Sequence, residues 1–172
     1  MAEKAERSGT MTEYFVAQSP DQIASREDLV SQSGYDFMRG ILEGRLSAPP
    51  ISGVLNYRLH SVEEGRVIFR GTPEFCHTNP VGAVHGGWYG TLLDSCMACT
   101  VMTMLPAGQV YTTLEFRINI TRALPPGMEI EAEGVIQHIG RSTGVARGEL
   151  RGVEDGRLYA TGSTTCLIMD GG

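Results

Sequence analysis

Hydrophobic side chains fill residues 90–105 almost without interruption, and Asp94 is the one charged residue among them. A helix that is apolar on every side is normally buried, so the pattern predicts a core helix at residues 86–105. An ionised carboxylate in such a helix is destabilising unless it is hydrogen-bonded, paired or neutralised. Asp94 is therefore either fixed for structural reasons or retained for chemistry, and this pattern alone leaves both open.

Strands are predicted on both sides of this helix. Before it, two apolar runs separated by the tripeptide EEG predict a hairpin. After it, apolar and polar residues alternate, which is typical of a sheet with one packed face and one polar face. The predicted strands cover residues 54–62, 66–72, 113–121, 128–139, 142–153 and 157–169. In the strand at 113–121, we place Thr113 on the polar face and Leu114, Phe116, Ile118 and Ile120 on the packed face.

The N-terminal part of the chain divides into an extension and a helix. Residues 1–32 are polar with little periodicity, so we predict a flexible or loosely docked extension. From Ser33, which is suited to cap a helix, apolar residues recur at helical spacing as far as Leu46. The dipeptide Pro49-Pro50 then ends the helix. Residues 33–172 are predicted to form one folded domain.

These elements predict an α+β fold in which a curled antiparallel sheet wraps around one long helix, with an extra N-terminal helix. A single sheet around a single helix leaves the other face of the sheet and its edge uncovered. We therefore expect at least a dimer.

Composition argues against several classes of function. The 172 residues carry 14 Lys and Arg against 20 Asp and Glu, with no basic run, so nucleic acid is not an expected partner. No apolar segment reaches the length of a membrane span, and the first residues lack the apolar core of a secretory signal. We therefore expect no membrane association and a cytoplasmic location. Cys96 and Cys99 form a CxxC pair inside the apolar helix, where we interpret them as core thiols.

The tripeptide HGG at residues 85–87 opens the predicted helix and indicates an oxyanion-binding site. Free N–H groups at a helix start point along its axis, and the helix dipole adds partial positive charge. Asp94 lies two turns past Gly86, about 12 Å along the axis at about 1.5 Å per residue. Within one subunit, the two groups are too far apart to act on the same carbonyl carbon. If both are catalytic, Asp94 has to come from a second subunit.

Two segments carry a resemblance to a known family. Residues 77–87 read HTNPVGAVHGG, and residues 91–95 read TLLDS. With its spacing HxNxxGxxHGGxxxxLxD, the string resembles the signature of hotdog-fold acyl-CoA thioesterases of the phenylacetate-degradation (PaaI) type. The resemblance runs from about Tyr35 to Met169 and includes the segments TLEFRI, PPG and GRST. It implies the hotdog fold, a sheet curled around one buried helix.

The resemblance also implies roles for individual residues. Asp94 matches the acid that acts as nucleophile or as general base for water, and Gly86 matches the glycine whose N–H polarises the thioester carbonyl. His85 matches a residue that orients the loop, and Asn79 matches a polar residue near the carbonyl or the attacking water. Thr113 matches a Ser or Thr beside the carboxylate. In the family, the glycine and the acid come from opposite subunits.

The same resemblance implies how CoA is bound and how the subunits assemble. The residues implied as contacts for CoA are Gly87, Arg122, Arg141, Ser142 and Thr143. The run ITRALP departs from the aromatic-Leu-Arg-Pro pattern of the family at this point. We expect an acyl-CoA substrate, no metal and no cofactor other than the CoA of the substrate. The expected assembly is a homodimer that pairs into a homotetramer.

Several alternatives stay open on the sequence alone. Asp94 could be a structural carboxylate, and His85 could be only a helix cap, with catalysis needing just the Gly86 N–H. A hotdog enoyl-CoA hydratase or dehydratase would pair a catalytic histidine with an acid across the same interface. A non-catalytic acyl-CoA-binding domain would keep Asp94 for structure. A metal site formed by Cys76, His77, His85 and Asp94 matches no standard ligand spacing.

Overall fold

The computed structural model of the chain describes residues 13–171. Its helical elements are the 3-10 helices η1 (Pro20–Gln22) and η2 (Phe75–His77) and the helices α1 (Arg26–Val30), α2 (Gly34–Leu42), α3 (Pro50–Val54) and α4 (Gly86–Met102). Its strands are β1 (Tyr57–Glu63), β2 (Arg66–Gly71), β3 (Gln109–Ile120), β4 (Ile130–Ile139), β5 (Thr143–Gly152) and β6 (Leu158–Asp170).

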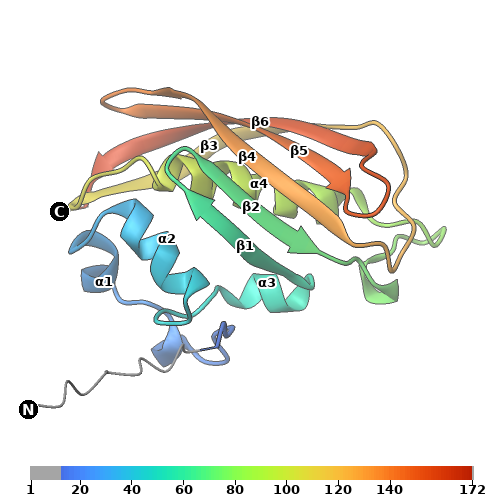
Figure 1. The fold of residues 1–172 in the computed structure, drawn as a ribbon, viewed down its shortest axis with the longest axis horizontal. Helices are drawn as coiled ribbons and strands as arrows, with labels where there is room; N and C mark the ends of the chain where they lie inside the picture. The colour runs from blue at the N-terminus through green and yellow to red at the C-terminus, as the bar shows by residue number, and fades with distance from the viewer. Residues whose placement is uncertain (1–12, 172) are drawn as a thin grey trace, which may run out of the picture.

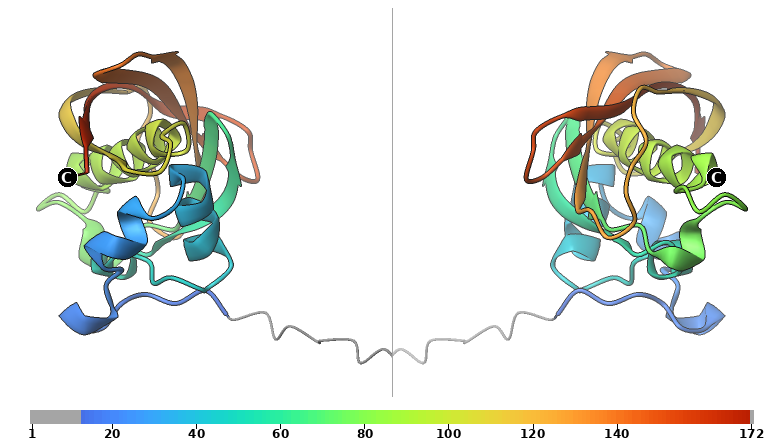
Figure 2. Two further views of the ribbon diagram at one scale, coloured as in Figure 1. Left: turned by 90° about the vertical axis from the view of Figure 1, so that its left-hand side faces the viewer. Right: turned by 90° about the vertical axis from the view of Figure 1, so that its right-hand side faces the viewer.

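One antiparallel sheet, with its strands in the order β1-β2-β4-β5-β6-β3, curls around α4 (Figure 1). End-on views show α4 on the concave side of the sheet, with the N-terminal helices below it (Figure 2). The α+β fold predicted from the sequence, with one long core helix and an extra N-terminal helix, is confirmed. Within residues 13–171, no helix is both long and apolar enough to cross a membrane.

Three glycines let α4 approach the sheet closely. Gly134 on β4 pairs with Gly148 on β5, which pairs with Gly162 on β6, so they form one row across neighbouring strands. A Cβ atom at Gly134 would lie 2.4 Å from the carbonyl oxygen of Cys96, and one at Gly148 would lie 2.8 Å from the Met97 side chain. This glycine row is therefore the surface on which the middle of α4 lies.

Gly134→Ala is expected to lower the free energy of unfolding by about 2–3 kcal/mol, because its Cβ would meet helix backbone that cannot move aside. For a chain of this size, the corresponding drop in Tm is roughly 4–12 °C. Thermal unfolding followed by circular dichroism measures it. Gly148→Ala is the matched control and should cost less, because its nearest neighbours are the flexible side chains of Met97 and Leu93. Equal losses for the two variants would contradict this explanation.

Three helix boundaries differ from the prediction, and one of them is the end of α4, which lies at Met102 and not near Leu105. α2 ends at Leu42 and does not continue to Leu46, because Gly44 adopts a left-handed conformation with φ of 71°. Residues 50–54 form α3 and do not lead directly into a strand, because Pro50 occupies a first helical position that favours proline. As a result, β1 begins at Tyr57.

Residues 13–32 contact the rest of the domain. Ala17 is 2% exposed, and its N–H donates to the Ala48 carbonyl oxygen at 3.0 Å. α1 begins with a capping box in which Ser25 and Asp28 exchange hydrogen bonds. Residues 1–12 of the predicted extension lie outside the described residues, and the division of the chain at residue 32 stays a prediction.

The edge strand β3 is only partly covered. Phe116 and Ile118 face α4, since both lie within 4 Å of the position that a Cβ atom at Gly90 would occupy. Nevertheless, Leu114 is 58% exposed, Phe116 45% and Ile120 46%. The fully packed face expected for this strand is therefore incomplete, because β3 is the last strand of the sheet and nothing within residues 13–171 lies beyond it.

Candidate active site

Helix α4 begins with one free backbone donor. His85 is the N-cap, and its Nδ1 accepts a hydrogen bond from the Gly87 N–H at 2.9 Å. The His85 carbonyl oxygen accepts from the Trp88 N–H, also at 2.9 Å. Among the described residues, the Gly86 N–H has no acceptor, and Gly86 is exposed. Since the helix dipole adds positive charge here, Gly86 can donate to an oxygen that carries negative charge.

Buried His77 anchors the loop that precedes α4. Its Nδ1 accepts from the Glu74 N–H at 2.8 Å, and its Nε2 lies 2.8 Å from the Val54 carbonyl oxygen. Its own carbonyl oxygen accepts from the His85 N–H at 2.9 Å. Both ring nitrogens are thus engaged, and His77 holds the residue that caps α4.

Asn79 closes a tight turn in the same loop. Its Oδ1 accepts from the N–H groups of Val81 and Ala83, each at 3.1 Å, and its own N–H donates to the Ala83 carbonyl oxygen at 2.8 Å. Within residues 13–171, its side-chain amide nitrogen has no hydrogen-bond partner. The half-buried Asn79 can therefore still donate to a bound carbonyl or water.

Asp94 lies two turns into α4 and is half-buried. Thr113 Oγ1 donates a hydrogen bond to its Oδ1 at 3.3 Å. Among residues 13–171, Asp94 forms no ion pair. Burial raises the pKa of the Asp94 carboxyl, and the smaller effect of the Thr113 hydrogen bond lowers it. A partly desolvated carboxylate without a cationic partner is a stronger base than one in water.

A β-bulge brings Thr113 to Asp94. The register between β3 and β6 shifts between Thr113 and Glu115, which leaves Leu114 as the extra residue. Strict alternation would place Thr113 and Phe116 on opposite faces, whereas the bulge turns both toward α4. The prediction from alternation that Thr113 lies on the polar face is therefore wrong.

Gly86 and Asp94 remain two turns apart on the same helix, or about 12 Å along its axis. The fold of one chain therefore does not bring them onto a single carbonyl group. Each lies near a different part of β3. Ile120 lies 3.6 Å from the Cβ position of Gly86, and Thr113 contacts Asp94.

Of the predicted CoA contacts, Gly87 and Arg122 lie near the start of α4. The Tyr89 hydroxyl accepts from the Leu124 N–H at 2.7 Å and donates to the Arg122 carbonyl oxygen at 3.5 Å. These bonds tie the segment after β3 to the first turn of the helix. The exposed Arg122 side chain lies over the Tyr159 ring, 6.0 Å from its centre.

The other predicted CoA contacts lie at the far end of α4. The turn between β4 and β5 contains Arg141 and Ser142, and Thr143 begins β5. There, a Cβ atom at Gly144 would lie 2.5 Å from Val101, which is one residue before the end of α4. Within one chain, these residues are therefore not brought together with Gly86.

The cysteines are free, and Cys96 and Cys166 are buried. Burial raises the pKa of the Cys96 thiol well above its ordinary value and that of the partly buried Cys99 to about 12. The CxxC pair consequently consists of two neutral thiols within α4. Among the described residues, no group of three His, Cys, Asp or Glu side chains is placed to hold a metal ion.

A sequence profile of the thioesterase superfamily matches residues 81–159, which include the end of the loop before α4, all of α4 and the strands β3, β4 and β5. Comparison with curated protein sequences gives no match.

Solved structures share the fold over most of their own length. A putative thioesterase from Ralstonia eutropha JMP134, described as phenylacetic acid degradation-related, is 28% identical over 76% of this chain and 98% of its own, with a TM-score of 0.69. A mutant of the phenylacetic acid degradation protein PaaI from Thermus thermophilus is 26% identical over 69% and 97%, with a TM-score of 0.63. A hypothetical thioesterase from Streptococcus pneumoniae TIGR4, solved with coenzyme A, is 25% identical over 67% and 87%, with a TM-score of 0.61. The expected hotdog fold is thereby confirmed.

Proposed function

We propose that this chain is a hotdog-fold thioesterase of the PaaI type, and that it hydrolyses an acyl-CoA to free CoA and a carboxylic acid. The observation that carries the proposal is one helix with two reactive groups. Gly86 offers an N–H that has no acceptor within residues 13–171, and Asp94 offers a carboxylate whose pKa is raised by burial. The first suits a developing oxyanion, and the second suits a base or nucleophile.

In the proposed reaction, the thioester carbonyl oxygen accepts a hydrogen bond from the Gly86 N–H as negative charge develops on it. Asp94 either attacks the carbonyl carbon itself or takes a proton from a water molecule that attacks it. In both routes the C–S bond breaks and CoA leaves as a thiolate that takes up a proton. When Asp94 attacks, the product is an anhydride between Asp94 and the acyl group, and water then hydrolyses it to free the acid and the Asp94 carboxylate. When water attacks, it supplies the new oxygen of the acid directly. The two routes remain alternatives.

The surrounding residues take supporting roles in this proposal. His85 orients the start of α4 through its bond to Gly87, and Asn79 donates to the carbonyl or the water from its side-chain amide nitrogen. Thr113 positions the Asp94 carboxylate. For CoA, the proposed contacts are Gly87, Arg122, Arg141, Ser142 and Thr143.

A second subunit would resolve the distance between Gly86 and Asp94. β3 is an edge strand with exposed apolar side chains, and such a strand can pair with its own copy. Near one end of β3, Thr113 forms a hydrogen bond with Asp94, and at the other end Ile120 lies beside Gly86. Antiparallel pairing of two β3 strands would therefore bring Asp94 of one subunit toward Gly86 of the other. A homotetramer built from two such dimers and a cytoplasmic location belong to the same proposal.

Release of free thiol from a panel of aryl, short-chain and long-chain acyl-CoAs tests the proposed activity. We expect hydrolysis of at least one of them. Hydration of an enoyl-CoA without thiol release would instead favour a hydratase. Binding of acyl-CoA without either reaction would favour a non-catalytic domain.

Thr113→Val is expected to move the acidic limb of the kcat/KM profile to higher pH. The reaction needs ionised Asp94, and the lost hydrogen bond is the interaction that lowers the pKa of this carboxyl. Rates of thiol release between pH 4 and pH 9 (roughly the range over which shifted carboxyl groups titrate) measure the limb. Thr112→Val is the matched control, since Thr112 is exposed on the same strand. A limb that stays in place, or moves to lower pH, would count against Asp94 as the titrating group.

A further inference from the structure

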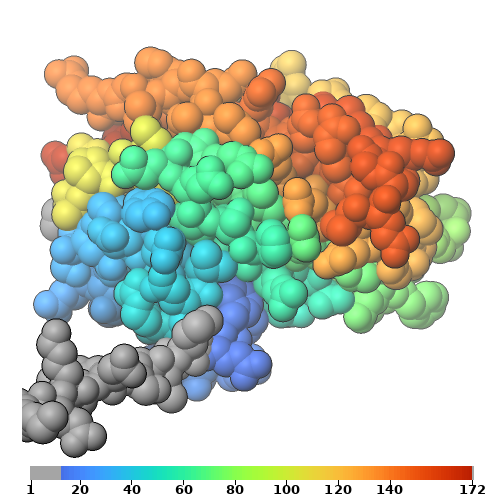
Figure 3. Space-filling model, in the orientation of Figure 1, coloured from blue at the N-terminus to red at the C-terminus, as the bar shows by residue number. Residues whose placement is uncertain are grey.

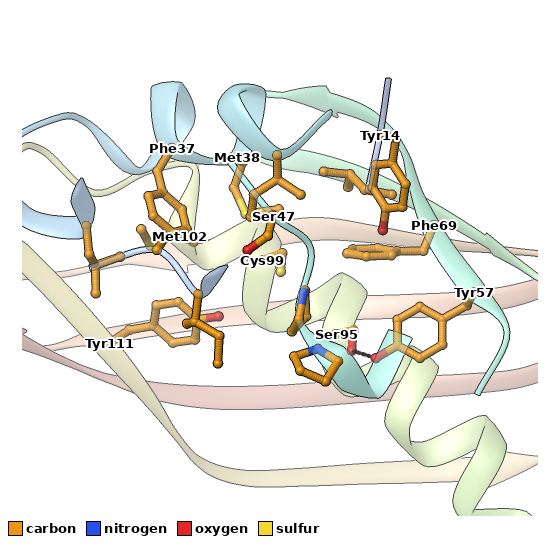
Figure 4. A pocket seen from close by; sticks show the side chains of 17 residues that line it. Tyr14, Phe37, Met38, Ser47, Tyr57, Phe69, Ser95, Cys99, Met102 and Tyr111 are labelled. Carbon is orange, nitrogen blue, oxygen red and sulfur yellow. Dashed lines mark hydrogen bonds between the residues drawn. The ribbon is translucent and has the colours of Figure 1, made fainter. Parts of the chain in front are cut away.

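An apolar cavity of about 390 Å³ lies between residues 13–42, here called the N-terminal segment, and the concave side of the sheet (Figure 4). Its wall combines residues from parts of the chain that are far apart in sequence. Phe37 and Met38 come from α2, Tyr57 from β1, and Tyr111 from β3. Ligand pockets in proteins typically start at about this size, so the cavity can hold a small ligand group.

One side of the cavity follows α4. Ser95, Cys99 and Met102 line it and are spaced at i, i+4 and i+7, so they form one face of the helix. The stripe is about 10 Å long and begins at the residue next to Asp94. Tyr111 also lines the cavity and lies two residues from Thr113, which binds Asp94. On α4 the cavity wall therefore comes within one residue of Asp94, and on β3 within two residues of Thr113.

Three of the polar side chains in the wall already form hydrogen bonds within the protein. The Tyr57 hydroxyl and Ser95 Oγ lie 3.0 Å apart in a hydrogen bond, and Ser47 Oγ donates to the Gln22 carbonyl oxygen at 2.7 Å. Burial raises the pKa of Tyr57 and that of Cys99 to about 12, so neither carries charge at neutral pH. None of the described residues that line the cavity is a charged residue, and most are apolar, which favours a hydrocarbon over a charged ligand group.

The N-terminal segment closes the cavity on the side away from the sheet. Tyr14, Ala24 and Phe37 line it from three parts of this segment. The segment is held to the domain by the backbone bridge between Val16 and Ala48. In the space-filling view, the N-terminal helices form one continuous surface with β1 and β2 (Figure 3).

We infer that this cavity holds the acyl chain of the thioester and that the N-terminal segment limits the length of this chain. The stripe on α4 is about 10 Å long, and a straight hydrocarbon chain advances about 1.3 Å per C–C bond, so the limit is about eight carbons. The inference rests on the proposed function for the identity of the ligand. Each methylene group buried in the cavity should improve binding about fourfold. The improvement should stop once the chain reaches the α2 end of the cavity.

Two measurements test the inference. The first is kcat/KM for straight-chain acyl-CoAs from acetyl to lauroyl. The second is the affinity for the matching S-alkyl-CoA thioethers, which cannot be hydrolysed. In the wild type, both kcat/KM and thioether affinity should rise with chain length and level off at about eight carbons. Thioether affinity that rises in this way without any hydrolysis would contradict the proposed function alone. A flat dependence on length in both would overturn the inference alone.

Variants of the N-terminal segment locate the chain. Ala24→Phe should fill part of the cavity and lower kcat/KM for octanoyl-CoA at least about tenfold, with little change for acetyl-CoA. Phe37→Ala should move the preferred length to longer chains, and it remains informative if Ala24→Phe does not fold. Tyr35→Ala is the matched control, because Tyr35 is a half-buried aromatic residue on α2 outside the cavity wall. A length preference that is unchanged in Phe37→Ala, or shifted equally in Tyr35→Ala, would overturn the inference.

Discussion

Asp94→Asn is expected to lower kcat for thiol release about 10²–10⁴-fold, which is the contribution typical of a positioned general base. Asparagine has nearly the same shape and can still accept the Thr113 hydrogen bond, but it neither takes up a proton nor attacks a carbonyl carbon readily. The initial rate of thiol release at saturating acyl-CoA measures the effect. Asp170→Asn, at the exposed end of β6, is the control for loss of a negative charge.

Thermal stability separates loss of chemistry from loss of fold in this variant. Burial raises the pKa of Asp94, so the ionised carboxylate is disfavoured in the folded state. The contribution of Asp94 to stability is therefore greatest below the pKa that this carboxyl has in the unfolded chain. The contribution is lost as the pH rises through the higher pKa that the carboxyl has in the folded protein. Asparagine stays neutral, so Asp94→Asn should have an equal or higher Tm at pH 7. Wild-type rates in this variant would show that Asp94 is structural.

Gly86→Pro is expected to lower kcat about 10²–10³-fold, because it removes the one backbone donor assigned to the oxyanion. The site is suited to proline. Gly86 is the first residue of α4, a position that favours proline. The preceding His85 has φ of −64° and ψ of 138°, which is the extended conformation required of a residue before proline. Added side-chain atoms would meet Ile120 at an ordinary contact distance of 3.6 Å. Gly86→Ala keeps the N–H and should lose far less activity.

Mixing the two inactive variants tests whether sites are shared between subunits. A dimer with one Asp94→Asn subunit and one Gly86→Pro subunit carries both defects in one site and neither in the other. Subunits that are unfolded and refolded together should therefore recover about a quarter of wild-type activity, given random pairing. A mixture no more active than its components, despite formation of mixed dimers, would rule out a shared site.

Much of the fold was predictable because its signals are local. The apolar run around Asp94 is dense enough to predict α4, and the HGG string marks where the helix begins. The helix boundaries at Gly44 and Pro50 depend on single backbone positions and were less accurate.

The candidate site was only partly predictable, because two of its features depend on contacts between distant segments. Leu114 looks like any other member of an alternating strand, and only its pairing with β6 shows that it is the bulged residue. The apolar cavity has no local signal, since Tyr14, Tyr57 and Tyr111 become neighbours only through the tertiary fold. The spacing of Ser95, Cys99 and Met102 is a helical stripe, but such a stripe usually means an ordinary packed core.

The glycine row also sets the rotation of α4 about its own axis. Gly134 lies under Cys96 and Thr100, and Gly148 lies under Leu93 and Met97, so one particular side of the helix faces the sheet. With 3.6 residues per turn, Asp94 is then directed roughly a third of a turn away from that side, toward the edge strand. A helix that rolled by one residue would turn the carboxylate either into the core or away from Thr113. Three positions without side chains thus orient a charge that belongs to another element of the fold.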